Sequence, residues 1–181
     1  MRETGLGNMR IEVERFKHYL LVLAVTFAGV MGCKSTEEGK PKKDRSLVML
    51  HIETNPDGTK YTRKIAVYKS DPIFFHIYTE PFLDTGSLDQ ATVMDALGGF
   101  AIQLQFNRHG TAVLDSFTTS NKGRHLIIFC QFDEPRWLAA PIISRRNSTG
   151  IIRFTPDCTR EEADRIVRGL NNSVKDIRKK N

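Results

Sequence analysis

The chain has 181 residues, of which 40% are hydrophobic and 27% charged, and its Lys and Arg residues exceed its Asp and Glu residues by a net charge of +6. This length is enough for one compact domain with a short tether. The positive charge is mild, so the composition argues against a nucleic acid partner, and a weak attraction to anionic lipid headgroups explains it more simply.

An apolar run near the N-terminus, residues 19–32, ends at Cys33. The run is shorter than the roughly 20 residues of a transmembrane helix, and its basic start and small-residue end are the layout of a secretory signal peptide. Its end, Val30-Met31-Gly32-Cys33, resembles the bacterial lipobox, in which the peptide is cut before a cysteine that then carries a diacylglycerol. We therefore predict lipid attachment at Cys33. A plain signal peptide with an incidental cysteine and an unusual N-terminal anchor helix are the alternatives.

These features predict three parts of the chain: a lipoprotein signal peptide over residues 1–32, a flexible tether over 33–45 and a folded domain over 46–178. The tether is polar and charged, so it can bury almost nothing. The domain is expected on the extracytoplasmic side of the cell envelope, held to membrane lipid through acylated Cys33. Lys34 stands where an aspartate would signal retention in the inner membrane, which favours the outer membrane if the cell is Gram-negative.

Strand patterns fill the first half of the domain. The apolar runs LVMLHIET (47–54) and YTRKIAVY (61–68) flank NPDGTK, whose Pro-Asp-Gly is typical of turns, so we expect a hairpin. IFFHIY at Ile73–Tyr78 predicts a third strand. FAIQLQF (100–106) alternates apolar and polar residues as a half-buried strand does, and Gly98-Gly99 predicts a tight turn before it.

The second half begins with a helix pattern in NRHGTAVLDSFTTSNKGR, where Gly123 suits the helix end. HLIIFCQF (125–132) is almost continuously apolar, which indicates a central strand. RWLAAPII and GIIRF indicate two more short strands, and Pro141 places the first of these at a sheet edge or a bulge.

The last helix has the clearest pattern. Thr159-Arg160-Glu161-Glu162 is a capping box, in which each end satisfies a free backbone N–H of the other. Apolar residues then recur every three or four positions over 159–174, so we expect Ile166 and Leu170 to be buried. Glu161–Arg165 and Asp164–Arg168 have the spacing of ion pairs on the wet face.

Strands interleaved with two one-sided helices predict an α+β fold. We expect a mixed, mainly antiparallel sheet with the two helices packed on one face, in a ferredoxin-like two-layer arrangement.

Patterns of catalytic chemistry are missing from the sequence. The five histidines are scattered: His18, His51, His76, His109 and His125. They lack metal-ligand spacing, and the chain has no C-x-x-C, nucleotide-binding glycine pattern or G-x-S-x-G. We therefore expect no enzyme activity, no metal and no cofactor. Trp137 and the aromatic residues of Ile73–Tyr78 are either core or a peptide-binding patch, and core is favoured.

Several segments occur in the order and at the distances of one known family. They are EPFLDTGSLDQA (80–91), FNRHG (106–110), GRHLII (123–128), AAPII (139–143) and FTPDCTREEA (154–163). On these motifs, residues 68–172 resemble the head part of the first periplasmic domain of SecD, a subunit of the bacterial Sec protein-export machinery. Pro156 and Cys158 depart from the family's glycine and aromatic residue, and SecD's membrane helices have no counterpart in these residues.

The resemblance implies a domain that contacts emerging polypeptide. It also places Cys130 and Cys158 at apolar positions of the family, so we expect both to be buried, free thiols; a disulfide between them, which an oxidising envelope would allow, is the alternative. The predicted function is a membrane-anchored lipoprotein that binds unfolded or translocating polypeptide, or Sec components, as an accessory to protein export. The alternative is a structural or regulatory envelope lipoprotein that docks a folded partner.

Replacing Cys33 by Ala should abolish acylation, because the thiol is the acceptor of the lipid. Labelling of growing cells with a palmitate analogue measures this, and Cys158→Ala, which leaves the lipobox intact, serves as the control. Equal labelling of Cys33→Ala and the parent chain would show that lipid is not attached at this residue.

Overall fold

The computed structural model describes residues 43–180. The predicted signal peptide, the lipid-attachment residue Cys33 and most of the predicted tether lie outside the described residues. Lys43 and Arg45, at the end of that tether, form ion pairs with Asp176 at 2.9 Å and 3.1 Å. Within residues 43–180, no helix is long and apolar enough to cross a membrane.

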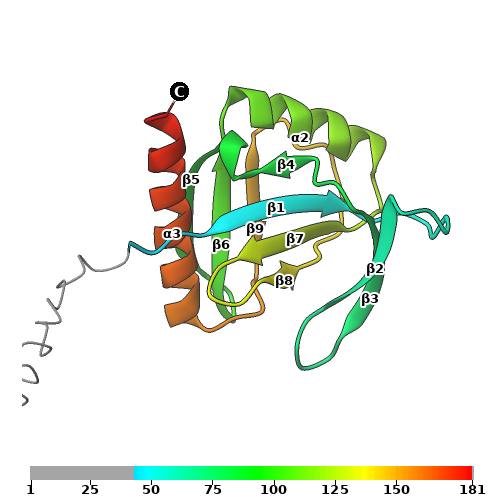
Figure 1. Cartoon of the computed structure of the whole chain (residues 1–181), viewed down its shortest axis with the longest axis horizontal. Helices are drawn as coiled ribbons and strands as arrows, with labels where there is room; N and C mark the ends of the chain where they lie inside the picture. The colour runs from blue at the N-terminus through cyan, green and yellow to red at the C-terminus, as the bar shows by residue number, and fades with distance from the viewer. Residues whose placement is uncertain (1–42, 181) are drawn as a thin grey trace, which may run out of the picture. The chain divides into compact units, whose positions relative to one another are not determined.

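The described strands pair antiparallel throughout and form three sheets (Figure 1). The first sheet contains, in order, β4 (Leu83–Asp84), β1 (Leu47–Ile52), β7 (Leu126–Gln131) and β8 (Arg136–Ala139). The second sheet contains β5 (Leu88–Ala96), β6 (Gly99–Phe106) and β9 (Ile151–Phe154). A two-stranded ribbon contains β2 (Thr62–Val67) and β3 (Ile73–Tyr78).

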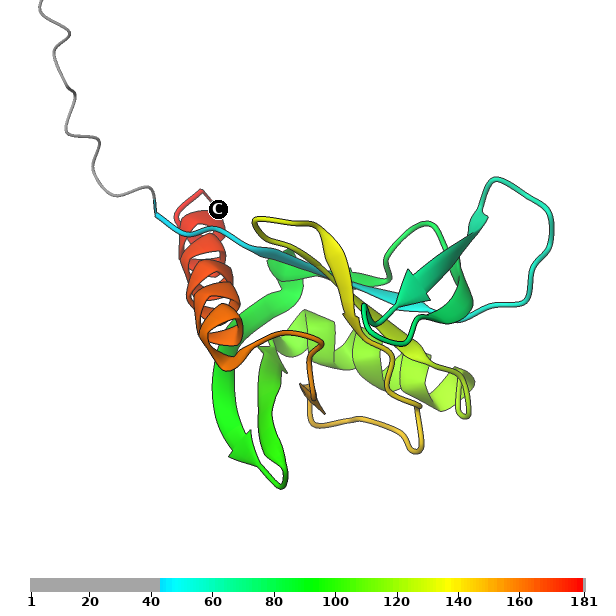
Figure 2. The same cartoon turned by 90° about the horizontal axis from the view of Figure 1, so that it is seen from below.

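Two α-helices and the short 3-10 helix η1 (Thr85–Ser87) complete the described domain. Helix α2 (Arg108–Ser120) begins at Asn107, whose side chain accepts a hydrogen bond from the Gly110 N–H at 2.9 Å. Helix α3 (Arg160–Arg178) begins at Thr159, whose hydroxyl accepts from the Glu162 N–H at 3.2 Å, as the capping box predicts. Helix α3 lies along β5 in both views (Figures 1 and 2).

Strand β7 separates two hydrophobic cores. Ile128 contributes to the larger core, which joins the two sheets to both helices through residues such as Leu104, Leu114 and Leu170. Ile127, on the opposite face of β7, contributes to a smaller core beneath the ribbon. Because alternate residues of a strand point to opposite faces, a strand between two cores must be apolar throughout. This explains the continuous apolar run 125–132.

The α+β class, the antiparallel pairing and the burial of Ile166 and Leu170 are confirmed. The strands are divided among three sheets, where we expected one. The expected hairpin is wrong, since β1 pairs with β4 and β7 whereas β2 pairs with β3. The reason is burial: β1 is largely buried and takes a central position, whereas β2 has polar, exposed residues and suits a two-stranded ribbon.

The wet face of α3 also differs from expectation. Its arginines reach residues outside the helix instead of acids one turn away. Arg165 pairs with Asp133 at 2.6 Å, and Arg168 pairs with Asp44 at 3.1 Å. These exposed pairs attach α3 to the β7–β8 turn and to the start of the described chain.

Leu170→Ala should destabilise the domain by about 2–5 kcal/mol, because it leaves a cavity in the larger core. Thr159→Ala should cost about 1 kcal/mol through the lost cap. Leu97→Ala is the matched control, since Leu97 is fully exposed at 108% in the β5–β6 turn. Urea denaturation of residues 43–181 measures all three, and equal midpoints for Leu170→Ala and Leu97→Ala would contradict the packing described here.

Candidate functional site

Two of the described histidines, His51 and His125, each join separate segments of the fold, whereas the side chains of His76 and His109 make no hydrogen bond with a described residue. His51 is buried, and its Nδ1–H donates to the Tyr78 carbonyl at 2.9 Å, which ties β1 to the ribbon. Burial lowers the pKa of His51, so the neutral ring is favoured. His125 contacts the Glu53 carboxylate at 2.7 Å. Among residues 43–180 there is no group of three or more His, Cys, Asp or Glu side chains placed to hold a metal.

The two cysteines of the domain are free thiols. Cys130 is buried as expected, whereas Cys158 is only half-buried at the margin of the larger core. Burial raises the pKa of Cys130 to about 12 and that of Cys158 to about 11. Cys158 is therefore not activated by its place just before α3, and neither thiol has the character of a nucleophile.

The aromatic residues divide between core and surface according to the face of β3 on which they lie. Phe75 and Ile77 are buried in the smaller core, against which the half-buried Trp137 packs. Phe74 and Tyr78 point the other way and are 61% and 43% exposed. The core interpretation thus holds for the inner face of the ribbon, and the outer face is an exposed aromatic surface.

Side chains satisfy backbone groups at several strand edges of the described domain, among them those at Val48 and Ala91. The Thr85 hydroxyl accepts from the Val48 N–H at 2.7 Å and donates to the Val48 carbonyl at 3.2 Å, beside the very short β4. The Asn171 side-chain amide accepts from the Ala91 N–H and donates to the Ala91 carbonyl, both at 2.9 Å. Each side chain thereby takes the place of a neighbouring strand at one residue, and Asn171 closes the outer edge of β5 at Ala91.

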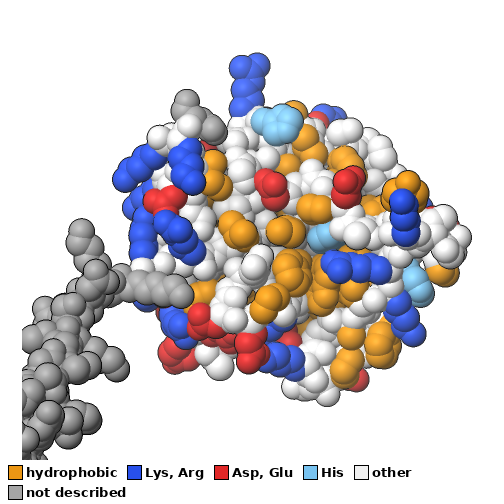
Figure 3. All heavy atoms as spheres, in the orientation of Figure 1, with side chains coloured by type: hydrophobic (Ala, Val, Ile, Leu, Met, Phe, Trp, Pro, Cys, Tyr) orange, Lys and Arg blue, Asp and Glu red, His pale blue; other side chains and the backbone are white. Residues whose placement is uncertain are grey.

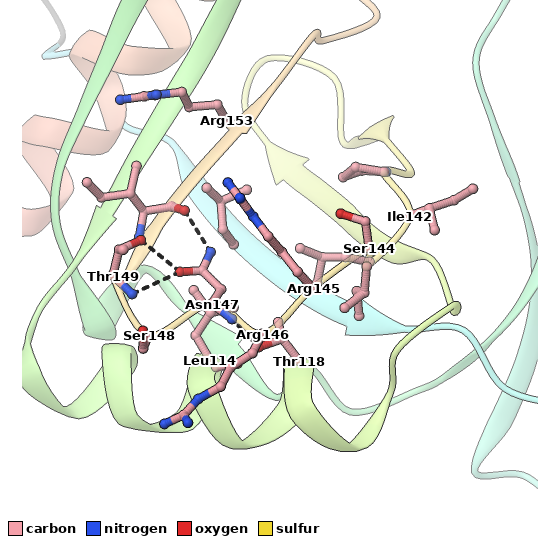
Figure 4. Close-up of a pocket in the computed structure, with 15 residues that line it drawn as sticks. Leu114, Thr118, Ile142, Ser144, Arg145, Arg146, Asn147, Ser148, Thr149 and Arg153 are labelled. Carbon is pink, nitrogen blue, oxygen red and sulfur yellow. Dashed lines mark hydrogen bonds between the residues drawn. The ribbon is translucent and has the colours of Figure 1, made fainter.

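Two further strand edges border an open space, which we call the edge slot. One wall is residues 139–143, which extend β8, and the other is β9; the loop 144–150 joins the walls in a U (Figure 4). Two cavities of about 640 and 370 Å³ lie in the slot, and Pro141 and Arg153 line both. Pro141 therefore lies at a sheet edge, as its sequence context predicts.

Strand β9 turns unpaired backbone groups toward the slot. The Phe106 N–H donates to the Gly150 carbonyl at 2.8 Å, which sets the alternation of hydrogen bonds between β6 and β9. The backbone groups of Ile151 and Arg153 consequently point away from β6. The Arg153 N–H and carbonyl have no hydrogen-bond partner among the described residues.

The facing wall has the same property. The Pro141 carbonyl accepts from β7 at 2.8 Å, and the Ile143 N–H donates to the Arg124 carbonyl at 2.9 Å. The backbone of Ile142 between them therefore points away from the sheet, and it too has no partner within residues 43–180. Both walls can thus accept hydrogen bonds from, and donate them to, an extended chain.

Other edge positions of the slot are satisfied by side chains. Asn147 donates through Nδ2 to the Ile151 carbonyl at 2.7 Å, and the Tyr68 hydroxyl accepts from the Ala140 N–H at 3.2 Å. Tyr68 has a φ of +71°, and it is the single non-glycine residue with positive φ in the described chain. A bulky residue rarely takes this conformation. The backbone is therefore strained at Tyr68, the residue whose hydroxyl forms part of the slot wall.

The slot is positively charged. Arg145, Arg146 and Arg153 line it, and Arg146 forms a two-point ion pair with Asp115 at 2.5 and 2.6 Å. Arg153 donates to the uncharged Gln103 amide at 2.7 Å. Arg145 has no hydrogen bond or ion pair with any described residue. In Figure 4 its side chain rises from the loop into the space between the walls.

The fold of the domain is similar to that of SecDF. One SecDF structure, described as a membrane component that enhances protein export, matches 71% of this chain and 63% of its own, at a TM-score of 0.51 and 18% identity. SecDF in a super-membrane-facing form matches 71% of this chain and 19% of its own, at a TM-score of 0.52 and 18% identity. The chain thus spans less than two thirds of either protein. No protein-family model and no curated protein matches it.

The predicted SecD-like domain is thereby confirmed at the level of fold. The residues of the slot were not predicted from the sequence. The loop SRRNSTG has the turn chemistry of Asn, Ser, Thr and Gly, which indicates a connection between strands. Nothing in that pattern shows that its flanking strands belong to different sheets.

Asn171→Ala should destabilise the domain by about 2 kcal/mol, because it leaves the N–H and carbonyl of the buried Ala91 without partners. Asn172→Ala is the matched control, because this neighbour on α3 makes one bond, to the Asp44 carbonyl at 3.0 Å. Chemical denaturation compares the two variants. If both variants lose equally little free energy of unfolding, Asn171 does not serve as a substitute strand.

Proposed function

We propose that this protein is a lipid-anchored, extracytoplasmic envelope protein that binds extended polypeptide in the edge slot and assists protein export. In this proposal it is not an enzyme, its membrane attachment is acylated Cys33, and its domain corresponds to the head of the first periplasmic domain of SecD. Polypeptide binds as an added strand.

The observation that carries the proposal is the pair of unpaired edges at the slot. Backbone N–H and C=O groups of Arg153 and Ile142 border a cavity of about 640 Å³. Main-chain hydrogen bonds to such an edge give affinity without demanding a particular sequence, which suits a protein that handles many chains. Exposed edges are normally blocked, as the Asn171 side chain does at Ala91 of β5.

The similarity of fold to SecDF supports the part of the proposal that concerns protein export. SecDF is described as enhancing protein export, and the present domain spans part of its length. A membrane tether would hold the slot close to the site where chains emerge.

One observation favours a second candidate, a lipoprotein that docks a folded partner. The outer face of the ribbon exposes Phe74, Tyr78 and the preceding Tyr61, which is 65% exposed, and Lys64 lies over the Phe74 ring at 4.5 Å. Hydrophobic side chains gather beside Lys and Arg over this part of the surface (Figure 3). Aromatic residues with neighbouring cations are typical of interface centres.

Titration with unrelated unfolded polypeptides distinguishes the two functions. Residues 43–181 can be used alone, because both described hydrophobic cores lie between Val48 and Val174. We expect micromolar binding of several unfolded chains, little affinity for their folded forms, and a weak dependence on salt. A tight, selective ligand that is lost in Phe74→Ala, with no affinity for unfolded chains, would favour the docking function.

Arg153→Pro and Arg153→Ala form a matched pair for the proposed strand addition. Both remove the side chain, but only proline removes the N–H that faces the slot, and this N–H is not part of the β6–β9 ladder. We expect Arg153→Pro to bind unfolded chains about fivefold more weakly than Arg153→Ala, as one lost hydrogen bond implies. Equal affinities, with both variants folded by circular dichroism, would exclude pairing at this edge.

A further inference from the structure

We infer that the edge slot receives the carboxy-terminal end of a polypeptide, and that Arg145 binds its terminal carboxylate. This inference rests on the proposed function and specifies which part of the bound chain the slot accepts.

The slot is closed at one end. The loop 144–150 crosses from one wall to the other, so the chain forms the base of a U (Figure 4). At this base Asn147 and Thr149 already occupy the outward groups of Ile151, at 2.7 Å from its carbonyl and 3.4 Å from its N–H. Pairing along β9 therefore cannot continue past Arg153 toward the loop. An added strand must end or turn away there.

The direction of β9 decides which end of the ligand lies at the base. Strand β9 starts at the loop and runs away from it, from Ile151 to Phe154. Antiparallel pairing is the commoner mode, and every described ladder of this domain is antiparallel. The facing wall, residues 139–143, runs toward the loop, but Ile142 lies there only in an isolated bridge, whereas β9 is a regular strand, so we assign the pairing to β9. A strand added antiparallel to β9 runs toward the loop, so its carboxy terminus meets the closed end.

Arg145 supplies the matching charge at this end. It rises from the loop into the slot (Figure 4), and no described acid pairs with it, whereas its neighbour Arg146 is held by Asp115. Guanidinium binds carboxylate through two parallel hydrogen bonds. A free arginine at the closed end of a slot with two unpaired edges therefore fits a terminal carboxylate.

The test compares one short peptide, free of Asp and Glu, as its free acid and as its carboxy-terminal amide. Residues 43–181 should bind the free acid about tenfold more tightly, as a charge-assisted hydrogen bond implies, and salt should reduce this preference. Arg145→Gln should abolish the preference while the amide still binds. Arg108→Gln, which removes an exposed arginine that does not line either slot cavity, should leave it unchanged.

A third peptide, amidated and ending in Glu, separates a terminal carboxylate from a side-chain carboxylate. It should bind like the uncharged amide. Equal binding of the free acid and the amide would overturn the inference and leave the proposed function standing. The same holds if Arg145→Gln still binds the free acid more tightly than the amide, or if the Glu amide binds as tightly as the free acid. Failure of every peptide and every unfolded chain to bind would instead overturn the proposed function itself.

Discussion

Backbone N–H and C=O groups at the edge of a β-sheet need partners, and this requirement governs the described domain. Its strands form three separate sheets, so many edges must be closed by something other than a strand. Thr85 closes an edge at Val48, and Asn171 closes one at Ala91. Unpaired buried groups destabilise a fold, so these polar side chains are structural although they lie outside the hydrophobic core.

In the edge slot, only some of the edge backbone groups have partners. Asn147 and Tyr68 each satisfy one backbone group of a wall, and the groups of Arg153 and Ile142 remain free within the described chain. Tyr68 takes a strained backbone conformation where it contributes to this wall. These free groups face a cavity, which is the geometry that the proposed strand addition requires.

The sequence predicted local structure well because local patterns carry it. The continuous apolar run of β7 indicates a strand buried on both sides, and the capping box of α3 marks the start of the helix. Pairing of β1 with β2 was mispredicted because Pro-Asp-Gly specifies a turn and not the partners of the strands that flank it. The Asn171 bond to Ala91 joins residues far apart in the chain, and its helical position looks like any polar surface residue. The slot could not be predicted from the sequence either, because only the tertiary fold brings its two walls together.

The central claim is that the free edge of β9 accepts a polypeptide strand. Residue-resolved amide hydrogen exchange on residues 43–181 tests it most directly, with and without an unfolded chain. In the free domain the Arg153 amide should exchange faster than that of Ile152, which belongs to the β6–β9 ladder. Binding should slow exchange at Arg153 and Ile142. Binding that leaves these amides unchanged, or that protects the ribbon over Phe74–Tyr78 instead, would contradict the account.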